Sequence, residues 1–188
     1  MAAAQPIRNP KHVRALMVHF KQQGQYRNHV LVAFGIYTAL RISDILNIKC
    51  KDVYDFKKRR VLDEITLVEK KTGKTKTIAL NKNIKDALKL YFHNASYSSP
   101  LILNESNGKA ITRVHAFRLI NDAAIAVGIP FKVSCHSLRK TFGYHAWKKG
   151  AQPALLMDIY NHTSYTTTKR YLGITQDDQN SLYRTLTI

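Results

Sequence analysis

The sequence contains only two cysteines, Cys50 and Cys135, among its 188 residues. Neither cysteine belongs to a C-x-x-C pair, so a disulfide framework is excluded and a zinc site is disfavoured in a chain of this size. Cys135 adjoins His136, a pairing that also occurs at nucleophilic and metal sites. We expect ordinary half-buried packing for this thiol, and no bound metal.

Long apolar runs are also missing from the sequence. No segment reaches the roughly 18 consecutive apolar residues that a membrane span needs. The amino-terminal residues lack the charged and then apolar pattern of a secretory signal peptide. We therefore expect a cytoplasmic protein with no membrane partner.

Acidic residues are scarce. The 12 Asp and Glu residues face 30 Lys and Arg residues, which gives a formal net charge of +18. Such an excess is typical of proteins that bind nucleic acid, because each neutralised phosphate releases counterions. Charge alone leaves open a ribosomal-type RNA binder or a merely basic surface. The 45% hydrophobic content is sufficient for one sizeable domain.

Hydrophobic periodicity predicts a mostly helical α+β fold. Three segments carry the β-branched and aromatic content of strands, with a turn at 71–74 between the last two, and indicate a small three-stranded antiparallel sheet. These segments are 53–56, 60–69 and 75–80. The expected helices are 11–23, 27–40, 43–49, 83–94, 113–127, 136–149, 154–160 and 164–171. The second of these helices is apolar nearly all round, so we expect it to be buried.

Four short segments carry side chains suited to phosphodiester chemistry. Each of Arg41 and Arg139 has a planar guanidinium that can hold two non-bridging phosphate oxygens at once. Tyr171 offers a hydroxyl, which is a poor nucleophile at neutral pH unless a base or cations lie close. His136 and His162 can act as that base or as neutral hydrogen-bond donors. Together these residues could cleave a phosphodiester through a covalent intermediate.

The same segments resemble the active-site boxes of the tyrosine recombinases, the phage integrase family. T-A-L-R-I-S-D-I-L around Arg41 is similar to that family's T-G-L-R-x-S-E-L-like box, and H-S-L-R at 136–139 matches its H-x-L-R box. The family places a G-H pair nine residues before its tyrosine, and here Asn161-His162 precedes Tyr171 at that spacing. Asparagine replaces glycine best at left-handed backbone angles, so this departure is mild.

The resemblance implies a tyrosine-recombinase catalytic domain whose tyrosine leaves a 3′-phosphotyrosine and a free 5′ hydroxyl. It implies that Lys71, with Lys74 as second choice, protonates the leaving oxygen, and that Asp44 orients an arginine or histidine. No metal or other cofactor is expected, and ATP is not needed. The implied catalytic residues are Arg41, Lys71, His136, Arg139, His162 and Tyr171.

Duplex DNA is the partner that the resemblance implies, with the helix 113–127 in or beside the major groove. Ordinary surface charge remains an alternative for each predicted contact. We further expect a tetramer of identical chains on paired DNA sites, accessory DNA-bending proteins and a location at the nucleoid. The predicted DNA contacts are Lys74, Lys76, Arg113, His115, Arg118 and Lys140.

The expected organisation is a flexible leader over 1–9, the catalytic domain over 10–175 and an apolar tail over 176–188 that docks on a neighbouring subunit. Most members of the family carry a further amino-terminal domain, and Arg41 comes too early to leave room for one. We expect either a short member, like the fimbrial inversion recombinases, or a domain excised from a longer protein. Two other functions stay open: a catalytically silent DNA-binding regulator, and a topoisomerase-like enzyme that cleaves and reseals DNA.

Overall fold

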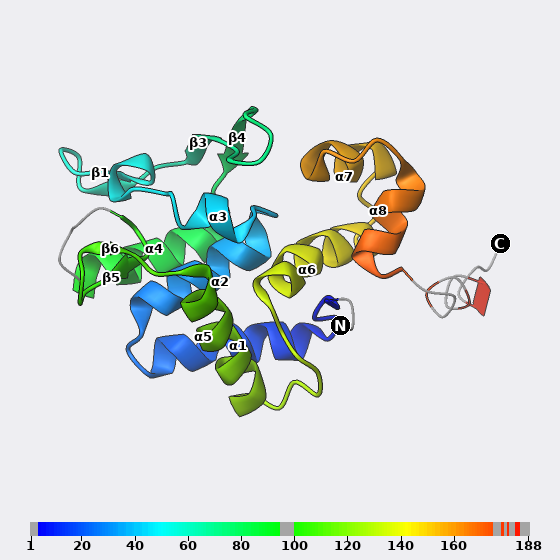
Figure 1. Ribbon diagram of the computed structural model, residues 1–188, viewed down its shortest axis with the longest axis horizontal. Helices are drawn as coiled ribbons and strands as arrows, with labels where there is room; N and C mark the ends of the chain where they lie inside the picture. The colour runs from blue at the N-terminus through cyan, green and yellow to red at the C-terminus, as the bar shows by residue number, and fades with distance from the viewer. Residues whose placement is uncertain (1–3, 95–99, 175–177, 179, 181–182, 185–188) are drawn as a thin grey trace.

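The computed structural model describes residues 4–94, 100–174, 178, 180, 183 and 184. Its helices form two groups (Figure 1). The larger group contains α1 (Pro10–Gln22), α2 (Tyr26–Tyr37), α4 (Lys82–Asn94) and α5 (Arg113–Ala126). The smaller group contains α6 (Cys135–Lys148), α7 (Pro153–Tyr160) and α8 (Tyr165–Leu172). The short α3 (Ile42–Ile45) and the 3₁₀ helix η1 (Cys50–Asp52) follow α2 along the chain.

Helix α2 is the centre of the hydrophobic core, as its apolar sequence predicts. All residues from 28 to 36 are buried, and α2 packs against α1, α4 and α6. The approach to α6 is close at Gly35, where an added Cβ would lie 2.7 Å from a methyl carbon of Leu138. The two groups of helices are therefore joined through the contact between α2 and α6.

The predicted α+β class is confirmed, but the sheet differs from the expectation. Instead of one three-stranded sheet, the part of the chain that the structure describes has three separate antiparallel pairs. The expected strand 60–69 divides at Leu62 and Asp63, because Leu62 N–H donates to Val53 and Asp63 O accepts from Leu80. Its first half pairs with β1 and its second half with β4. The pairs are β1 (Tyr54–Asp55) with β2 (Arg60–Val61), β3 (Glu64–Val68) with β4 (Thr75–Ala79), and β5 (Leu103–Asn104) with β6 (Lys109–Ala110).

A flexible leader is expected over 1–9, and of its described residues, 4–9, Ile7 and Arg8 contact α6. Ile7 is completely buried, and its backbone N–H donates to the Thr141 hydroxyl at 2.9 Å. The carbonyl of Ile7 lies 2.9 Å from Nε2 of His145. The Arg8 guanidinium donates to the carbonyl of Gly173, just beyond α8. The buried side chains of Pro6 and Ile7, with both backbone groups of Ile7 paired, explain the docking, although two adjacent apolar residues produce no periodic pattern in the sequence.

Replacing Ile7 with alanine is expected to destabilise the protein by about 2–4 kcal/mol, because a fully buried aliphatic side chain leaves a cavity. Chemical denaturation monitored by circular dichroism measures this change in the free energy of unfolding. Gln5→Ala is the control, since Gln5 is exposed two residues away. Equal stability of both variants would contradict a structural role for the segment.

The predicted tail over 176–188 falls mostly outside the described residues. Within it the Asp178 carboxylate lies 3.0 Å from Nζ of Lys148 and 3.2 Å from the Tyr144 hydroxyl. Docking of the tail on a neighbouring subunit therefore stays a prediction. None of the helices among the described residues is long and apolar enough to cross a membrane.

Candidate active site

The predicted catalytic residues come from separate elements that pack together. Arg41 immediately precedes α3, and His136 and Arg139 lie in the first turns of α6. His162 follows α7, and Tyr171 lies in the last turn of α8. Helices α6, α7 and α8 contact one another in all three pairs, which brings the side chains of α6 and α8 to one region.

Contacts with Ala39 and Tyr160 hold the Arg139 side chain in place. Its side chain is buried, and Nη1 donates to the carbonyl of Ala39, whose backbone has a left-handed φ of 56°. The guanidinium carbon lies 4.8 Å from the centroid of the Tyr160 ring, a cation–π contact. The Tyr160 hydroxyl donates to the carbonyl of Arg139 at 2.7 Å. Arg139 is therefore oriented by the same loop that carries Arg41.

His162 is fixed between α7 and the helix of Tyr171. Its ring stacks on Tyr160 at 5.5 Å and meets the Tyr171 ring nearly at right angles, with centroids 5.1 Å apart. Nδ1 of His162 is 3.1 Å from the hydroxyl of Thr168, three residues before Tyr171 on α8. Because one ring nitrogen is engaged by Thr168, Nε2 is the nitrogen left to act on a bound phosphate.

Both histidines are held toward the neutral form. Partial burial and then the charge of Arg139 lower the pKa of His162 below its usual value, with a contribution from Arg41. The pKa of His136 is lowered by the same two leading causes, followed by the charges of Lys140, Arg41 and Lys71. A neutral imidazole can accept a proton or donate its N–H, which is what the cleavage of a phosphodiester requires of it.

The Tyr171 ring is half-buried among side chains from three helices. Besides His162, it contacts the Tyr160 ring at 5.2 Å. Nζ of Lys140 lies 4.9 Å from its centroid. Lys140 is also a predicted DNA contact, and that contact stays a prediction. The tyrosine is thus positioned by α6, α7 and α8 together.

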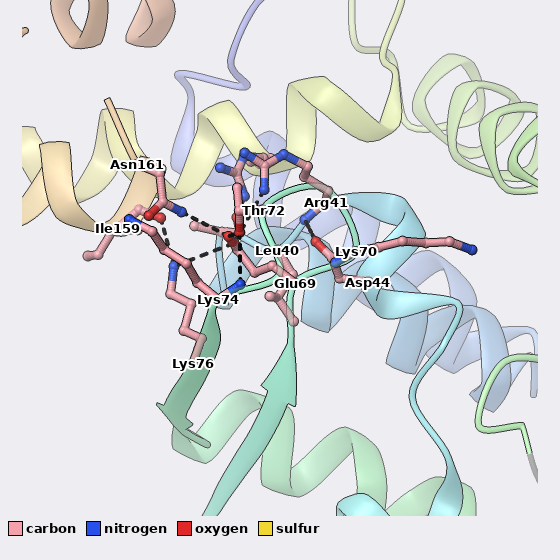
Figure 2. A network of polar contacts seen from close by, with 12 residues as sticks. Leu40, Arg41, Asp44, Glu69, Lys70, Thr72, Lys74, Lys76, Ile159 and Asn161 are labelled. Atoms are coloured by element: carbon pink, nitrogen blue, oxygen red, sulfur yellow. Dashed lines mark hydrogen bonds and ion pairs between the residues drawn. The ribbon is translucent and has the colours of Figure 1, made fainter. Parts of the chain in front are cut away.

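The hairpin between β3 and β4 reaches the site with its lysines. Lys71 is exposed in the turn, and its charge contributes to the lowered pKa of His136. Lys74 is exposed on the same turn. Lys76, predicted as a DNA contact, points inward: its Nζ donates to the carbonyl of Ile159 at 2.7 Å, and burial lowers its pKa (Figure 2).

Glu69 is the important residue that sequence reasoning missed. It follows β3 directly, its side chain is 1% exposed, and it lies within 4.0 Å of both Arg41 and Lys76 (Figure 2). Burial alone would raise the pKa of this carboxyl. The Thr72 hydroxyl and the charges of Lys76, Arg41 and Arg139 together lower the pKa by more than burial raises it, so the carboxylate form is favoured. The strand alternation of E-I-T-L-V-E, which puts Glu69 on the same inward face as Ile65, was the available signal.

Asp44 is buried, whereas two of the three predicted DNA contacts on α5 are exposed. The Asp44 carboxylate is buried and accepts from the backbone N–H of Arg41 and of Lys70, at 3.3 and 2.9 Å. It therefore ties the start of α3 to the hairpin, and orientation of an arginine or histidine side chain by Asp44 stays a prediction. On α5, Arg113 and Arg118 are exposed and His115 is half-buried. Contact of these three residues with DNA remains a prediction.

Gly143 permits α7 and α8 to approach α6. A Cβ at this position would lie 2.3 Å from a methyl carbon of Leu172 and 2.5 Å from the Tyr160 hydroxyl oxygen. Gly143→Ala is therefore expected to destabilise the domain by about 1–3 kcal/mol through overpacking. Since Leu172 adjoins Tyr171, the variant should also displace the tyrosine.

Thermal unfolding measures the stability of Gly143→Ala, and tryptophan fluorescence reports on Trp147, which packs in the same small core cluster. Gln152→Ala, at the exposed residue before α7, serves as the control. A Gly143→Ala protein with unchanged stability and spectrum would show that α7 and α8 do not pack on α6 as described.

The cysteines and acidic residues form no second reactive centre in the described ranges. Burial raises the pKa of the Cys50 and Cys135 thiols to about 11, which disfavours the thiolate. No group of three or more His, Cys, Asp or Glu side chains is arranged to hold a metal ion within the residues that the structure describes.

Comparison with known proteins identifies relatives over nearly the whole chain. The model of the "Phage integrase family" matches residues 9–177. The "Probable integrase/recombinase YoeC" of Bacillus subtilis (strain 168) is 33% identical over 184 residues, which cover 98% of this chain and 97% of that protein.

Two solved structures show the same fold. The crystal structure of XerA recombinase superimposes with a TM-score of 0.76 at 20% identity, over 98% of this chain and 64% of that one. The structure of XerH site-specific recombinase, bound to palindromic difH substrate in a post-cleavage complex, superimposes with a TM-score of 0.74 at 18% identity. The match covers 98% of this chain and 54% of that one. The chain thus spans about half to two thirds of these two proteins.

Proposed function

The chain belongs to the phage integrase family, and from this membership we propose that it is a site-specific recombinase that cleaves and rejoins duplex DNA through a 3′-phosphotyrosine. The observation that supports this most strongly is the convergence of Arg139, His162 and Tyr171. Arg139 and the Tyr171 ring both contact Tyr160, and His162 contacts the rings of Tyr160 and Tyr171.

In the proposed cleavage step the guanidinium groups of Arg41 and Arg139 bind the non-bridging oxygens of the scissile phosphate. The Tyr171 hydroxyl oxygen attacks phosphorus, and its proton passes to the neutral imidazole of His136 or His162. The bond from phosphorus to the 5′ oxygen breaks, and that oxygen takes a proton from Lys71. Donors fixed in advance, such as the buried Arg139, stabilise the charge that develops on the phosphate.

We prefer Lys71 to Lys76 as the proton donor. It is exposed on the turn, and its charge already acts on His136. Lys76 is engaged by the carbonyl of Ile159 and by Glu69. Rejoining reverses the step: a 5′ hydroxyl, from the same or a second duplex, attacks the phosphotyrosine and restores the tyrosine hydroxyl. The phosphotyrosine conserves the bond energy, so ATP is not required.

The proposed partner is duplex DNA, and the net charge of +18 supports this choice. The related XerH was solved with its DNA substrate bound. We place Arg113, His115 and Arg118 of α5 and Lys74 of the hairpin against the phosphate backbone or the groove. Assembly as a tetramer on paired sites, with accessory DNA-bending proteins, belongs to the same proposal.

The function is tested with nicked duplexes drawn from the DNA that flanks the gene, incubated with the protein in EDTA. A recombinase gives a protein–DNA adduct on a denaturing gel and joined products from paired sites. Relaxation of supercoils without joined products would favour the cleave-and-reseal enzyme. Tight, salt-sensitive binding without any adduct would favour the regulator and contradict the proposal.

A further inference from the structure

A buried carboxylate lies at the junction between the hairpin and the arginine of α3. Glu69 directly follows β3 and continues the inward face of that strand, on which Ile65 is buried and Leu67 is half-buried. Its side chain is only 1% exposed. A buried charge is costly unless it is paired and hydrogen-bonded, so its partners indicate what it does.

The partners of Glu69 come from four different places in the chain. Oε2 accepts from the Thr72 hydroxyl in the turn and from Nδ2 of Asn161 after α7, both at 2.8 Å. Oε1 lies 3.3 Å from Nη1 of Arg41 and 4.0 Å from Nζ of Lys76 (Figure 2). The carboxylate thus joins the hairpin turn, β4, the start of α3 and the end of α7.

The contact between Glu69 and Arg41 is electrostatic without being a hydrogen bond. Nη1 of Arg41 and Oε1 of Glu69 are both buried, and neither has a hydrogen-bond partner among the described residues. The charge holds the guanidinium in place without engaging Nη1 in a hydrogen bond. A phosphate oxygen is the acceptor that a guanidinium fork fits best.

Asn161 does more than replace a glycine. Its φ of 55° and ψ of 46° are left-handed, and glycine would adopt them more easily. The asparagine adds the amide that donates to Glu69. His162 is the next residue, and its backbone N–H is fixed to the carbonyl of Met157 at 2.9 Å. The amide therefore links the hairpin to the residue beside a candidate catalytic histidine.

We propose that Glu69 and Asn161 are positioning residues that lock the hairpin, Arg41 and His162 in one arrangement before DNA binds. The inference rests on the proposed recombinase function. Misplacing a catalytic group by about 1 Å can reduce a rate about 10²-fold, and the locked arrangement prevents such a shift. The pair should therefore affect the rate of cleavage more than the affinity for DNA.

Asn161→Gly removes the amide and keeps the left-handed backbone. We expect the single-turnover rate of adduct formation at saturating DNA to fall about 10-fold, with the Kd for DNA changed less than about 3-fold. Asn161→Asp should be slower still, because a second carboxylate then faces Glu69. Arg59→Gly is the matched control, since Arg59 is also left-handed, at a φ of 50°, and lies in the separate β1–β2 turn.

The double variant Glu69→Gln/Asn161→Asp exchanges the donor and the acceptor. If the two side chains act through their hydrogen bond, the double variant should be at least about 10-fold faster than the product of the two single losses predicts. A double variant whose rate loss equals the product of the two single losses would overturn the proposal.

Hydrogen exchange of the protein without DNA separates this inference from the proposed function. Exchange of the amides of Glu69 and Gly73, which are hydrogen-bonded within the turn, should be faster in Asn161→Gly than in the wild type or in Arg59→Gly, because the turn loses its tie to α7. Unchanged exchange in the turn would overturn the positioning proposal even if cleavage occurs. Absence of any wild-type adduct, with faster exchange in Asn161→Gly, would contradict the recombinase function and would still support the positioning role of Glu69 and Asn161.

Discussion

Replacing Tyr171 with phenylalanine is expected to abolish the covalent adduct with DNA, a loss on the order of 10⁴-fold or more, because the nucleophilic oxygen is removed. Its ring contacts with Tyr160, His162 and Lys140 involve the aromatic face and edge, which phenylalanine keeps. The Kd for DNA should therefore stay within about 2-fold of the wild-type value, and the free energy of unfolding within about 0.5 kcal/mol. Adducts are measured on denaturing gels with nicked duplexes.

Tyr165→Phe is the matched control for this variant. Tyr165 begins the same helix α8, is 40% exposed, and has no ring contact with the site residues. It should form the adduct at the wild-type rate. An adduct that persists in Tyr171→Phe would show that Tyr171 is not the nucleophile. Its disappearance in Tyr165→Phe would then assign that role to Tyr165.

Replacing Arg139 with lysine should reduce the rate of adduct formation about 10²–10³-fold, the usual loss when one preorganised donor to a developing anion is removed. Lysine keeps the positive charge but lacks the planar fork that holds two phosphate oxygens. It would also lose the fixed bond to the carbonyl of Ala39 and the stacking on Tyr160. Single-turnover rates at saturating DNA isolate this effect from binding.

The matched control is Arg170→Lys, at an exposed position of α8 beside Tyr171. It should slow cleavage less than about 3-fold. Arg41→Lys provides a second test in case Arg139→Lys unfolds, since Arg41 is partly exposed. Wild-type rates in both Arg41→Lys and Arg139→Lys would show that the two arginines do not bind the reacting phosphate.

The helices and the candidate catalytic residues could be predicted from sequence because their signals are local. Helix α2 contains an unbroken apolar run from Val30 to Tyr37, and Gly150, with a φ of 84°, follows the end of α6. The site residues lie far apart along the chain, and nothing in composition brings them together. Their order and spacing resembled a family pattern, and that resemblance grouped them before the structure did.

The remaining features depend on contacts that a sequence does not display. The expected strand 60–69 changes partners at Leu62 because of two backbone hydrogen bonds that join it to different neighbours. Ile7 docks on α6 next to a buried Pro6, and two adjacent apolar residues show no periodicity. Glu69 was detectable as an acid on the inward face of a strand, but its partner Asn161 is 92 residues away. Only the fold shows that these two side chains meet.

Mapping the DNA-linked residue tests the central claim most directly. The adduct would be digested with trypsin and nuclease, and the modified peptide sequenced by tandem mass spectrometry. We predict a phosphonucleotide on Tyr171 in the tryptic peptide 171–184, joined through the 3′ end of the cleaved strand, with a 5′ hydroxyl on the released fragment. A linkage at Tyr183 of the same peptide, or a released fragment with a 3′ hydroxyl, would contradict the account.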